Sequence, residues 1–145
     1  TFRENFAVPS PNNPIATEGK IFVRPGNRLP LIPDQLFKVG GRIPVIEKIS
    51  ISGDLLATSG QYLRGDESNL MEKTSPYVVI NARLEYRLNE DTMFFLEMNN
   101  LLDEQYETFG LFGEPSEVLG ESFQNNRFLS PGAPRAAWLG VRMTF

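Results

Sequence analysis

Two pairs of neighbouring carboxylates in this chain, Asp66-Glu67 and Asp103-Glu104, are candidates for acid–base chemistry. Paired carboxylates are the residue type that glycoside hydrolysis uses as acid and base or nucleophile. Both pairs lie in polar segments with the composition of loops. Because adjacent residues of an extended chain point to opposite sides, neither pair can face one substrate. We therefore assign no catalytic residues.

Oxygen-bearing side chains gather in residues 65–69, Gly-Asp-Glu-Ser-Asn. Such a segment could hold calcium, a hard cation that prefers carboxylate and carbonyl oxygens. Its spacing does not match that of an EF-hand loop. We interpret residues 65–69 as a solvated loop apex and expect no metal site.

The chain contains no histidine and no cysteine. These absences exclude Ser-His-Asp and Cys-His catalysis, zinc sites built on either residue, and attachment of c-type haem. The net charge is −4 and the pI is about 4.9, with Lys and Arg scattered singly. Nucleic acids require clustered cations. We expect no enzyme activity, no cofactor and no nucleic-acid partner.

Apolar residues alternate with polar ones along much of the chain, which has 145 residues, 12 Gly and 11 Pro. Alternation with period two predicts an all-β, antiparallel fold. No run approaches the roughly 18 apolar residues of a membrane helix. The first residues lack the layout of a signal peptide, so we expect any export signal to lie outside this chain.

The pattern predicts a meander of strands over residues 36–42, 46–62, 77–88, 92–102 and 135–145. Residues 1–35 are expected to be mostly loop. The predicted connections alternate between short turns, at 43–45 around Pro44 and at 89–91, and long loops, at 63–76 and 103–134. Outer-membrane barrels have short periplasmic turns and long extracellular loops in this order. The sequence therefore favours the last five or so strands of a large transmembrane β-barrel.

One face of the predicted strands is charged and the other is apolar. We expect a wet lumen, or the surface of a plug, to contact Arg83, Glu85, Arg87, Glu97 and Asn99. We expect lipid to contact Val78, Ile80, Leu84, Leu96, Leu139 and Val141. In the last strand, Leu139, Val141, Met143 and Phe145 give every second position an apolar side chain.

A soluble β-sandwich binding module with no membrane role is the alternative, because antiparallel sandwiches also alternate and have turns of uneven length. Two features favour the barrel. The charges of residues 83–87 suit a wet lumen, and a soluble protein has no physical reason to end on an apolar face. Solubility as a monomer without detergent would favour the sandwich.

Four motifs occur in order along the chain, and two pieces of them, Asn-Leu-x-Asp-x-x-Tyr and Pro-Gly-x-Pro-Arg, are specific when they are found together at this spacing. The four motifs are Gly26-Asn27-Arg28-Leu29-Pro30-Leu31-Ile32-Pro33, Ser59-Gly60-Gln61-Tyr62-Leu63-Arg64-Gly65-Asp66-Glu67-Ser68-Asn69, Asn99-Asn100-Leu101-Leu102-Asp103-Glu104-Gln105-Tyr106 and Ser130-Pro131-Gly132-Ala133-Pro134-Arg135 through Phe145. With these motifs the chain resembles the end of a TonB-dependent receptor. From the residues themselves, Asn99 and Asn100 are expected to bond the backbone where a strand passes into a loop.

The resemblance implies a barrel of about 22 strands closed around a plug in the outer membrane of a Gram-negative bacterium. Residues 1–145 would be its C-terminal segment, with no plug domain present. Members of the family import scarce nutrients, commonly iron-siderophore complexes or cobalamin, with energy from TonB, which reaches them through the plug.

By analogy with the family, Leu139, Val141, Met143 and Phe145 would be the signal that the barrel-assembly machinery recognises. An isolated piece would have two unpaired sheet edges and a lipid-facing surface without lipid. We expect such a fragment to self-associate. The nutrient itself and the residues that contact it are not encoded in any motif of this segment.

Overall fold

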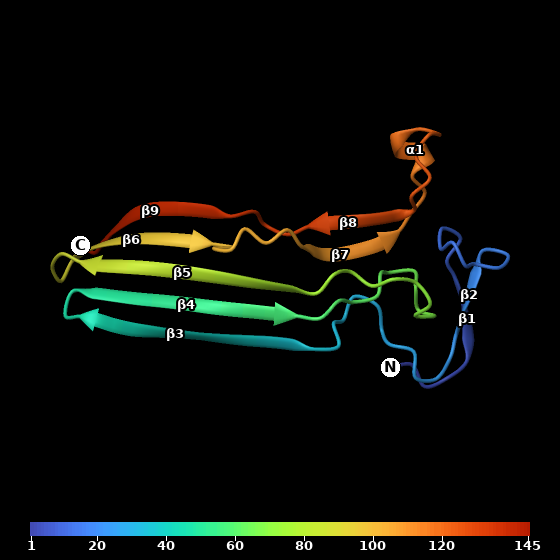
Figure 1. The fold of residues 1–145 in the computed structure, drawn as a ribbon, viewed down its shortest axis with the longest axis horizontal. Coiled ribbons are helices and arrows are strands. Elements are labelled where there is room, and N and C mark those ends of the chain that lie inside the picture. Colours follow the sequence, from blue (N-terminus) through green and yellow to red (C-terminus); the bar gives the residue numbers. More distant parts are fainter. The chain divides into compact units, whose positions relative to one another are not determined.

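The computed structural model describes residues 1–145, with the exception of the side chains of Glu117 and Val118. The chain forms two compact units, which are described separately (Figure 1). Unit 1 comprises Thr1–Asp34, Ser59–Pro76 and Tyr106–Gly132, and unit 2 comprises Gln35–Thr58, Tyr77–Gln105 and Ala133–Phe145. In the described part of the chain, no helix has the length and apolar character needed to cross a membrane.

Unit 2 is a five-stranded antiparallel sheet with the strand order β3-β4-β5-β6-β9. The strands are β3 (Leu36–Ile46), β4 (Ile49–Thr58), β5 (Tyr77–Arg87), β6 (Thr92–Asn99) and β9 (Ala136–Met143). Short turns join β3 to β4 and β5 to β6 at one end of the sheet, where β9 also ends (Figure 1). Long connections leave from the other end. The prediction of an all-β antiparallel meander is confirmed.

The first turn of the sheet lies later in the chain than predicted. We expected the chain to turn around Pro44, but Pro44 pairs with Ser50 inside β3, and the turn is at Glu47 and Lys48. The prediction failed because Pro44 lies beside a register shift in β3, where the regular ladder of hydrogen bonds is interrupted. A proline is tolerated there, since its missing N–H need not bond a neighbour. The register shift between Pro44 and Ile46 accommodates the approach to the turn.

Unit 1 contains two hairpins that the sequence did not predict. In the first, β1 (Phe6–Pro9) pairs with β2 (Lys20–Val23), two short strands within residues 1–35. The segment 103–134 was predicted to be a loop. It contains β7 (Glu107–Phe112) and β8 (Arg127–Pro131), which pair with each other, and the one-turn helix α1 (Ser116–Leu119) between them.

Three distant segments supply the core of unit 1. Ile21 and Val23 from β2, Leu63 and Phe112 are all buried. The carbonyl oxygen of Gly65 accepts hydrogen bonds from distant side chains, Ser10 Oγ at 2.8 Å and Asn13 Nδ2 at 2.7 Å. Contacts this far apart in sequence leave no periodic signal.

The interpretation of residues 65–69 as a solvated apex is wrong, because Asp66 is completely buried. Its carboxylate accepts hydrogen bonds from Ser68 Oγ at 2.8 Å and from the backbone N–H groups of Leu70 and Met71 at 3.2 and 3.0 Å. Asp66 therefore shapes the turn that follows it. Sequence reasoning missed this role because acidic residues are seldom fully buried.

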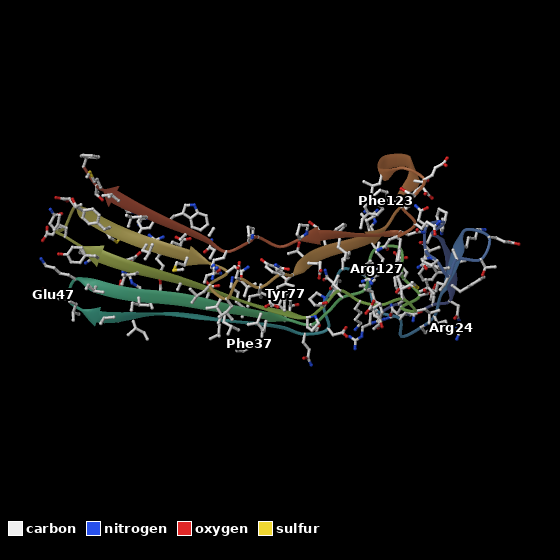
Figure 2. The ribbon with its side chains drawn as sticks, turned by 45° about the horizontal axis from the view of Figure 1, so that its top comes forward. Arg24, Phe37, Glu47, Tyr77, Phe123 and Arg127 are labelled. Atoms are coloured by element: carbon white, nitrogen blue, oxygen red, sulfur yellow. The ribbon has the colours of Figure 1, made fainter. Side chains whose placement is uncertain are left out.

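The sheet of unit 2 is a single layer. Its strands contact only their hydrogen-bonded neighbours. Side chains project from both faces of the sheet, and Phe37 on β3 projects from one of them (Figure 2). One face carries a row of aliphatic residues, directly opposite one another on all five strands: Ile43, Ile51, Leu84, Leu96 and Leu139. Leu139 is 80% exposed. Among the described strands of unit 2, no second sheet covers this apolar face as a sandwich would require.

Candidate functional site

The opposite face of the sheet carries a second row, in which polar residues predominate. Arg42, Ser52, Arg83, Glu97 and Trp138 lie directly opposite one another on the five strands. Side chains alternate between faces along a strand, so residues at even spacings from this row share its face. All eight charged residues of the five strands therefore lie on this polar face: Lys38, Arg42, Asp54, Arg83, Glu85, Arg87, Glu97 and Arg142.

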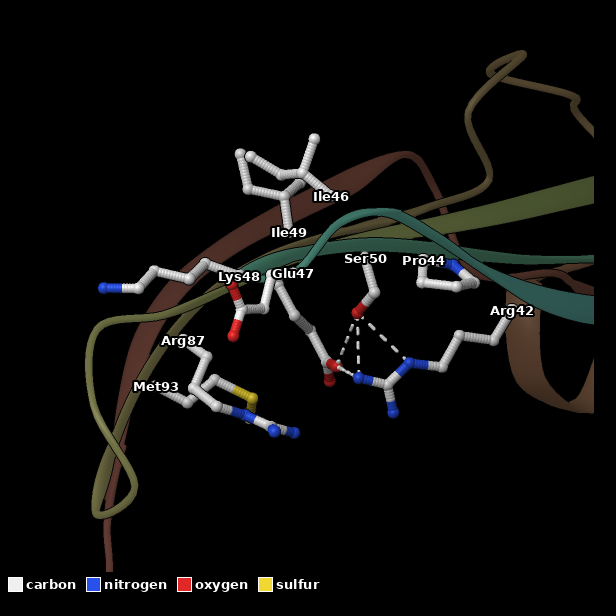
Figure 3. Close-up of a pocket in the computed structure, with 10 residues that line it drawn as sticks. Arg42, Pro44, Ile46, Glu47, Lys48, Ile49, Ser50, Arg87 and Met93 are labelled. Atoms are coloured by element: carbon white, nitrogen blue, oxygen red, sulfur yellow. Dashed lines mark hydrogen bonds and ion pairs between the residues drawn. The ribbon is translucent and has the colours of Figure 1, made fainter.

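Ion pairs join the charged side chains at the centre of the polar face. Arg83 binds Glu85 Oε1 at 2.9 Å and Glu97 Oε2 at 2.8 Å. Arg42 binds the other oxygen of Glu85 and donates to Ser50 Oγ at 2.8 Å (Figure 3). The Glu85 side chain is only 13% exposed, although it lies on an open sheet. Its two arginine partners therefore hold it away from water.

The aromatic ring of Phe95 continues this network to the last strand. The Arg83 guanidinium carbon lies 4.3 Å from the ring centroid, in cation–π geometry. Gly140 is directly opposite Phe95, and a Cβ atom at Gly140 would lie 2.4 Å from the ring. Glycine thus provides the space in which the ring lies over β9, an arrangement that stabilises glycine in sheets.

The polar face is hollowed in two places. A groove of about 340 Å³ near the short turns is lined by residues that include Arg42, Lys48, Glu85, Arg87 and Met93 (Figure 3). A second hollow of about 340 Å³ is lined by Asp54, Asn81, Arg83, Glu97 and Asn99, among others. Within the described residues, no group of three His, Cys, Asp or Glu is placed to hold a metal ion.

The structure brings together only some of the residues that we expected to face a lumen. Arg83, Glu85 and Glu97 are in contact. Arg87 lies on the same face but lines the groove beside this cluster, and Asn99 lines the second hollow. Of the expected assembly signal, Leu139, Val141 and Met143 lie on the apolar face, and Phe145 follows β9 and is fully exposed.

Asn100 closes the connection between β6 and β9. It is 2% exposed, and its Nδ2 group donates to the carbonyl oxygens of Glu104 and Ala133 at 2.9 and 3.1 Å. Its Oδ1 atom accepts the Glu104 N–H at 2.9 Å. This bonding confirms the expectation for Asn100 at the end of the strand. Its φ of +50° is a conformation that asparagine tolerates better than most residues.

Two further contacts join the same pair of motifs. In unit 2, Arg135 forms an ion pair with Asp103 at 3.4 Å. In unit 1, the Gly132 N–H donates to the Tyr106 carbonyl at 2.7 Å, and a Cβ at Gly132 would lie 2.2 Å from the Tyr106 ring. The motifs Asn-Leu-x-Asp-x-x-Tyr and Pro-Gly-x-Pro-Arg are therefore the two ends of one connection, which explains why they occur together.

The other two motifs also contact each other, within unit 1. The Arg28 N–H donates to Asn69 Oδ1, while Asn69 Nδ2 donates to the Arg28 carbonyl at 3.0 Å. Asp34 binds Lys73 and Arg28, each at 2.7 Å. The hydrogen bond from Lys73, together with the charges of Lys73 and Arg28, lowers the pKa of Asp34 below its ordinary value, although partial burial opposes the shift.

The fold resembles those of three solved receptor structures. The siderophore receptor PiuA of Acinetobacter baumannii superimposes with a TM-score of 0.66 over 82% of this chain, at 19% identity. The ferric-catecholate import receptor Fiu of Escherichia coli K12 gives 0.62 over 81% in its closed form, at 24% identity, and 0.60 over 77% in its open form, at 22% identity.

The chain covers only 15% of each of these receptors. No protein-family model matches the chain, and no curated protein matches its sequence. The structural likeness shows that the chain has the all-β fold of a part of the barrel of such receptors.

Proposed function

We propose that this chain is the C-terminal part of the barrel of a TonB-dependent receptor in the outer membrane of a Gram-negative bacterium. The observation that carries the proposal is the distribution of charge in unit 2. All eight charged residues of the five strands lie on one face, and the other face presents aliphatic and aromatic side chains without a covering layer. The likeness to PiuA and Fiu supports the same reading at the level of fold.

Lipid contact accounts for the apolar face. A cation placed on the lipid face of a barrel costs about 2–4 kcal/mol at the bilayer midplane, whereas an aliphatic side chain is stabilised there. Val78, Ile80, Leu84, Leu96, Leu139 and Val141 would all contact hydrocarbon. Tyr86 and Phe94 stack at 6.5 Å on this face, next to the short turns, where an interfacial aromatic band is expected.

The polar face would then line the barrel interior. Arg83, Glu85 and Glu97 already satisfy much of one another's charge. This pairing suits a wall that meets a plug domain, because unpaired charges would be costly where water is excluded. Arg87 and Asn99, which line the two hollows, are the groups we assign to contacts with that plug.

Unit 1 would be the extracellular part of the segment, since its segments include the two long connections. The transported nutrient is, in this proposal, an iron-siderophore complex or a similar small ligand, by analogy with the neighbours described as siderophore and ferric-catecholate receptors. TonB would supply energy through a plug domain. This chain would contribute wall and loops, and no catalysis.

Assembly and self-association are two consequences of this proposal. Leu139, Val141, Met143 and Phe145 would present an apolar strand to the barrel-assembly machinery, so Phe145→Ala should reduce the amount of receptor in the outer membrane more than its affinity for nutrient. The isolated segment has exposed edges at β3 and β9, and we expect it to associate with copies of itself.

The direct test is location and energy dependence in cells. A receptor carrying this segment, tagged in the 113–126 connection, should fractionate with the outer membrane and support growth on a ferric siderophore only when TonB is present. Recovery of the tagged protein in the soluble fraction would refute the membrane proposal. Outer-membrane location with uptake independent of TonB would refute the transport mechanism alone.

A further inference from the structure

The strand β2 in unit 1 presents two cations and an aromatic ring on its exposed side. Ile21 and Val23 are buried, while the alternate residues Lys20, Phe22 and Arg24 are exposed. Phe22 is 65% exposed. Arg24, labelled in Figure 2, directly follows the strand. An extended segment therefore places a ring between two positive side chains.

These residues border a groove of about 410 Å³, within the usual range for small-molecule sites. Its wall also includes Ile15, Asn27 and Leu70, and Leu70 is 73% exposed. Among the side chains that the structure describes, no acidic residue lines the groove. Among the described residues, neither Lys20 nor Arg24 makes an ion pair, although unit 1 contains more acidic than basic residues.

The lining of the groove determines what kind of molecule fits it. Exposed apolar side chains favour a ligand with an apolar body. Two unpaired cations favour an anionic group, and arginine adds a forked donor for an oxyanion. The Asn27 Oδ1 atom accepts the Arg24 N–H at 2.6 Å, which leaves the amide Nδ2 group as a further donor at the same wall.

The spacing permits one small ligand to reach both cations. The Cα atoms of residues four apart in an extended chain are separated by roughly 13 Å. Lysine and arginine side chains each extend about half that distance, so their charged ends can converge above Phe22. A membrane surface or a second protein would not require such a confined hollow.

We propose that this groove binds a small amphipathic anion, with an aromatic body against Phe22 and Leu70 and a carboxylate or similar oxyanion held by Lys20 and Arg24. The site stands on unit 1 alone. It does not depend on lipid contact by the sheet of unit 2, and it assigns a ligand class to residues that the receptor proposal leaves without a role.

Equilibrium dialysis of the full chain against 2-naphthoate and its neutral analogue 2-naphthamide tests the site. Non-ionic detergent at equal concentration on both sides of the dialysis membrane cancels the partition of the probes into micelles. We expect naphthoate to bind about tenfold more tightly than naphthamide, equivalent to ~1.4 kcal/mol. Added salt should weaken only the naphthoate, because it screens exposed charges. Equal binding of the two probes, or no binding of either, would overturn the proposal without affecting the receptor assignment.

Matched variants locate the binding. K20Q/R24Q should remove the preference for naphthoate, whereas R3Q/R64Q, which deletes the same charge from exposed positions of unit 1 outside the groove, should keep it. F22A should weaken both probes about equally. If K20Q/R24Q retains the preference, or R3Q/R64Q also loses it, the anion is bound elsewhere and the proposed site is wrong.

Discussion

Replacing Asn100 should release the connection between β6 and β9. The side chain makes three hydrogen bonds, to both backbone groups of Glu104 and to the Ala133 carbonyl. At about 1 kcal/mol net for each bond, N100G should lower the free energy of local opening by about 3 kcal/mol. N100A should lower it by about 4 kcal/mol, because alanine at a φ of +50° adds about 1 kcal/mol of strain.

Hydrogen exchange measured by mass spectrometry reads this loss directly. About 3 kcal/mol corresponds to a decrease of about 10²-fold in amide protection. The decrease should appear in peptides covering residues 100–106 and 131–136. N99A is the matched control, since Asn99 is the neighbouring asparagine and its side chain lines a hollow on the polar face. If N100G and N99A exchange at the same rate, Asn100 does not hold the connection and our account of the paired motifs is wrong.

Three further perturbations test other parts of the structure. Because the pKa of Asp34 is lowered in the folded protein, its ionised carboxylate stabilises the fold above the ordinary aspartate pKa of about 3.9, and this stabilisation is lost as the pH falls through the folded value. Residues 24–34 should therefore lose amide protection in acid. D34N should remove that pH dependence. G132A should cost about 1–3 kcal/mol by displacing the Tyr106 ring, measured by urea denaturation, whereas G41A, with open space at its Cβ, should cost less than about 1 kcal/mol; equal costs would exclude the ring contact. L84R should destabilise the membrane-inserted form by about 2 kcal/mol in lipid vesicles, and an unchanged urea midpoint would argue against lipid contact at that position.

The five strands of unit 2 were predictable because each of them shows a local alternation of apolar and polar residues. A single period-two pattern determines which face a residue occupies, so the alternation alone puts Arg83, Glu85 and Glu97 on one face. Their ion pairs depend on register across strands, which the pattern of one strand does not contain. The contribution of Arg42 to Glu85 was missed for that reason.

The errors in the predicted fold have two other physical causes. The turn assigned to Pro44 assumed that proline ends a strand, which does not hold beside a register shift such as the one between Pro44 and Ile46. The hairpin β7–β8 and the buried Asp66 depend on contacts among three segments far apart in sequence. Such contacts have no periodicity, so composition alone suggested solvated loops. Leu63, which is buried in the same region, shows how compact that region is.

The exposure of adjacent residues on β9 to lipid tests the central claim most directly. Trp138 and Leu139 are neighbours whose side chains lie on opposite faces, and the segment has no native cysteine to interfere with labelling. In vesicles containing the receptor, a fluorophore on L139C should be quenched strongly by spin-labelled acyl chains, and one on W138C should not. Equal quenching at the two positions, or stronger quenching at 138, would contradict the assignment of the aliphatic face to the membrane.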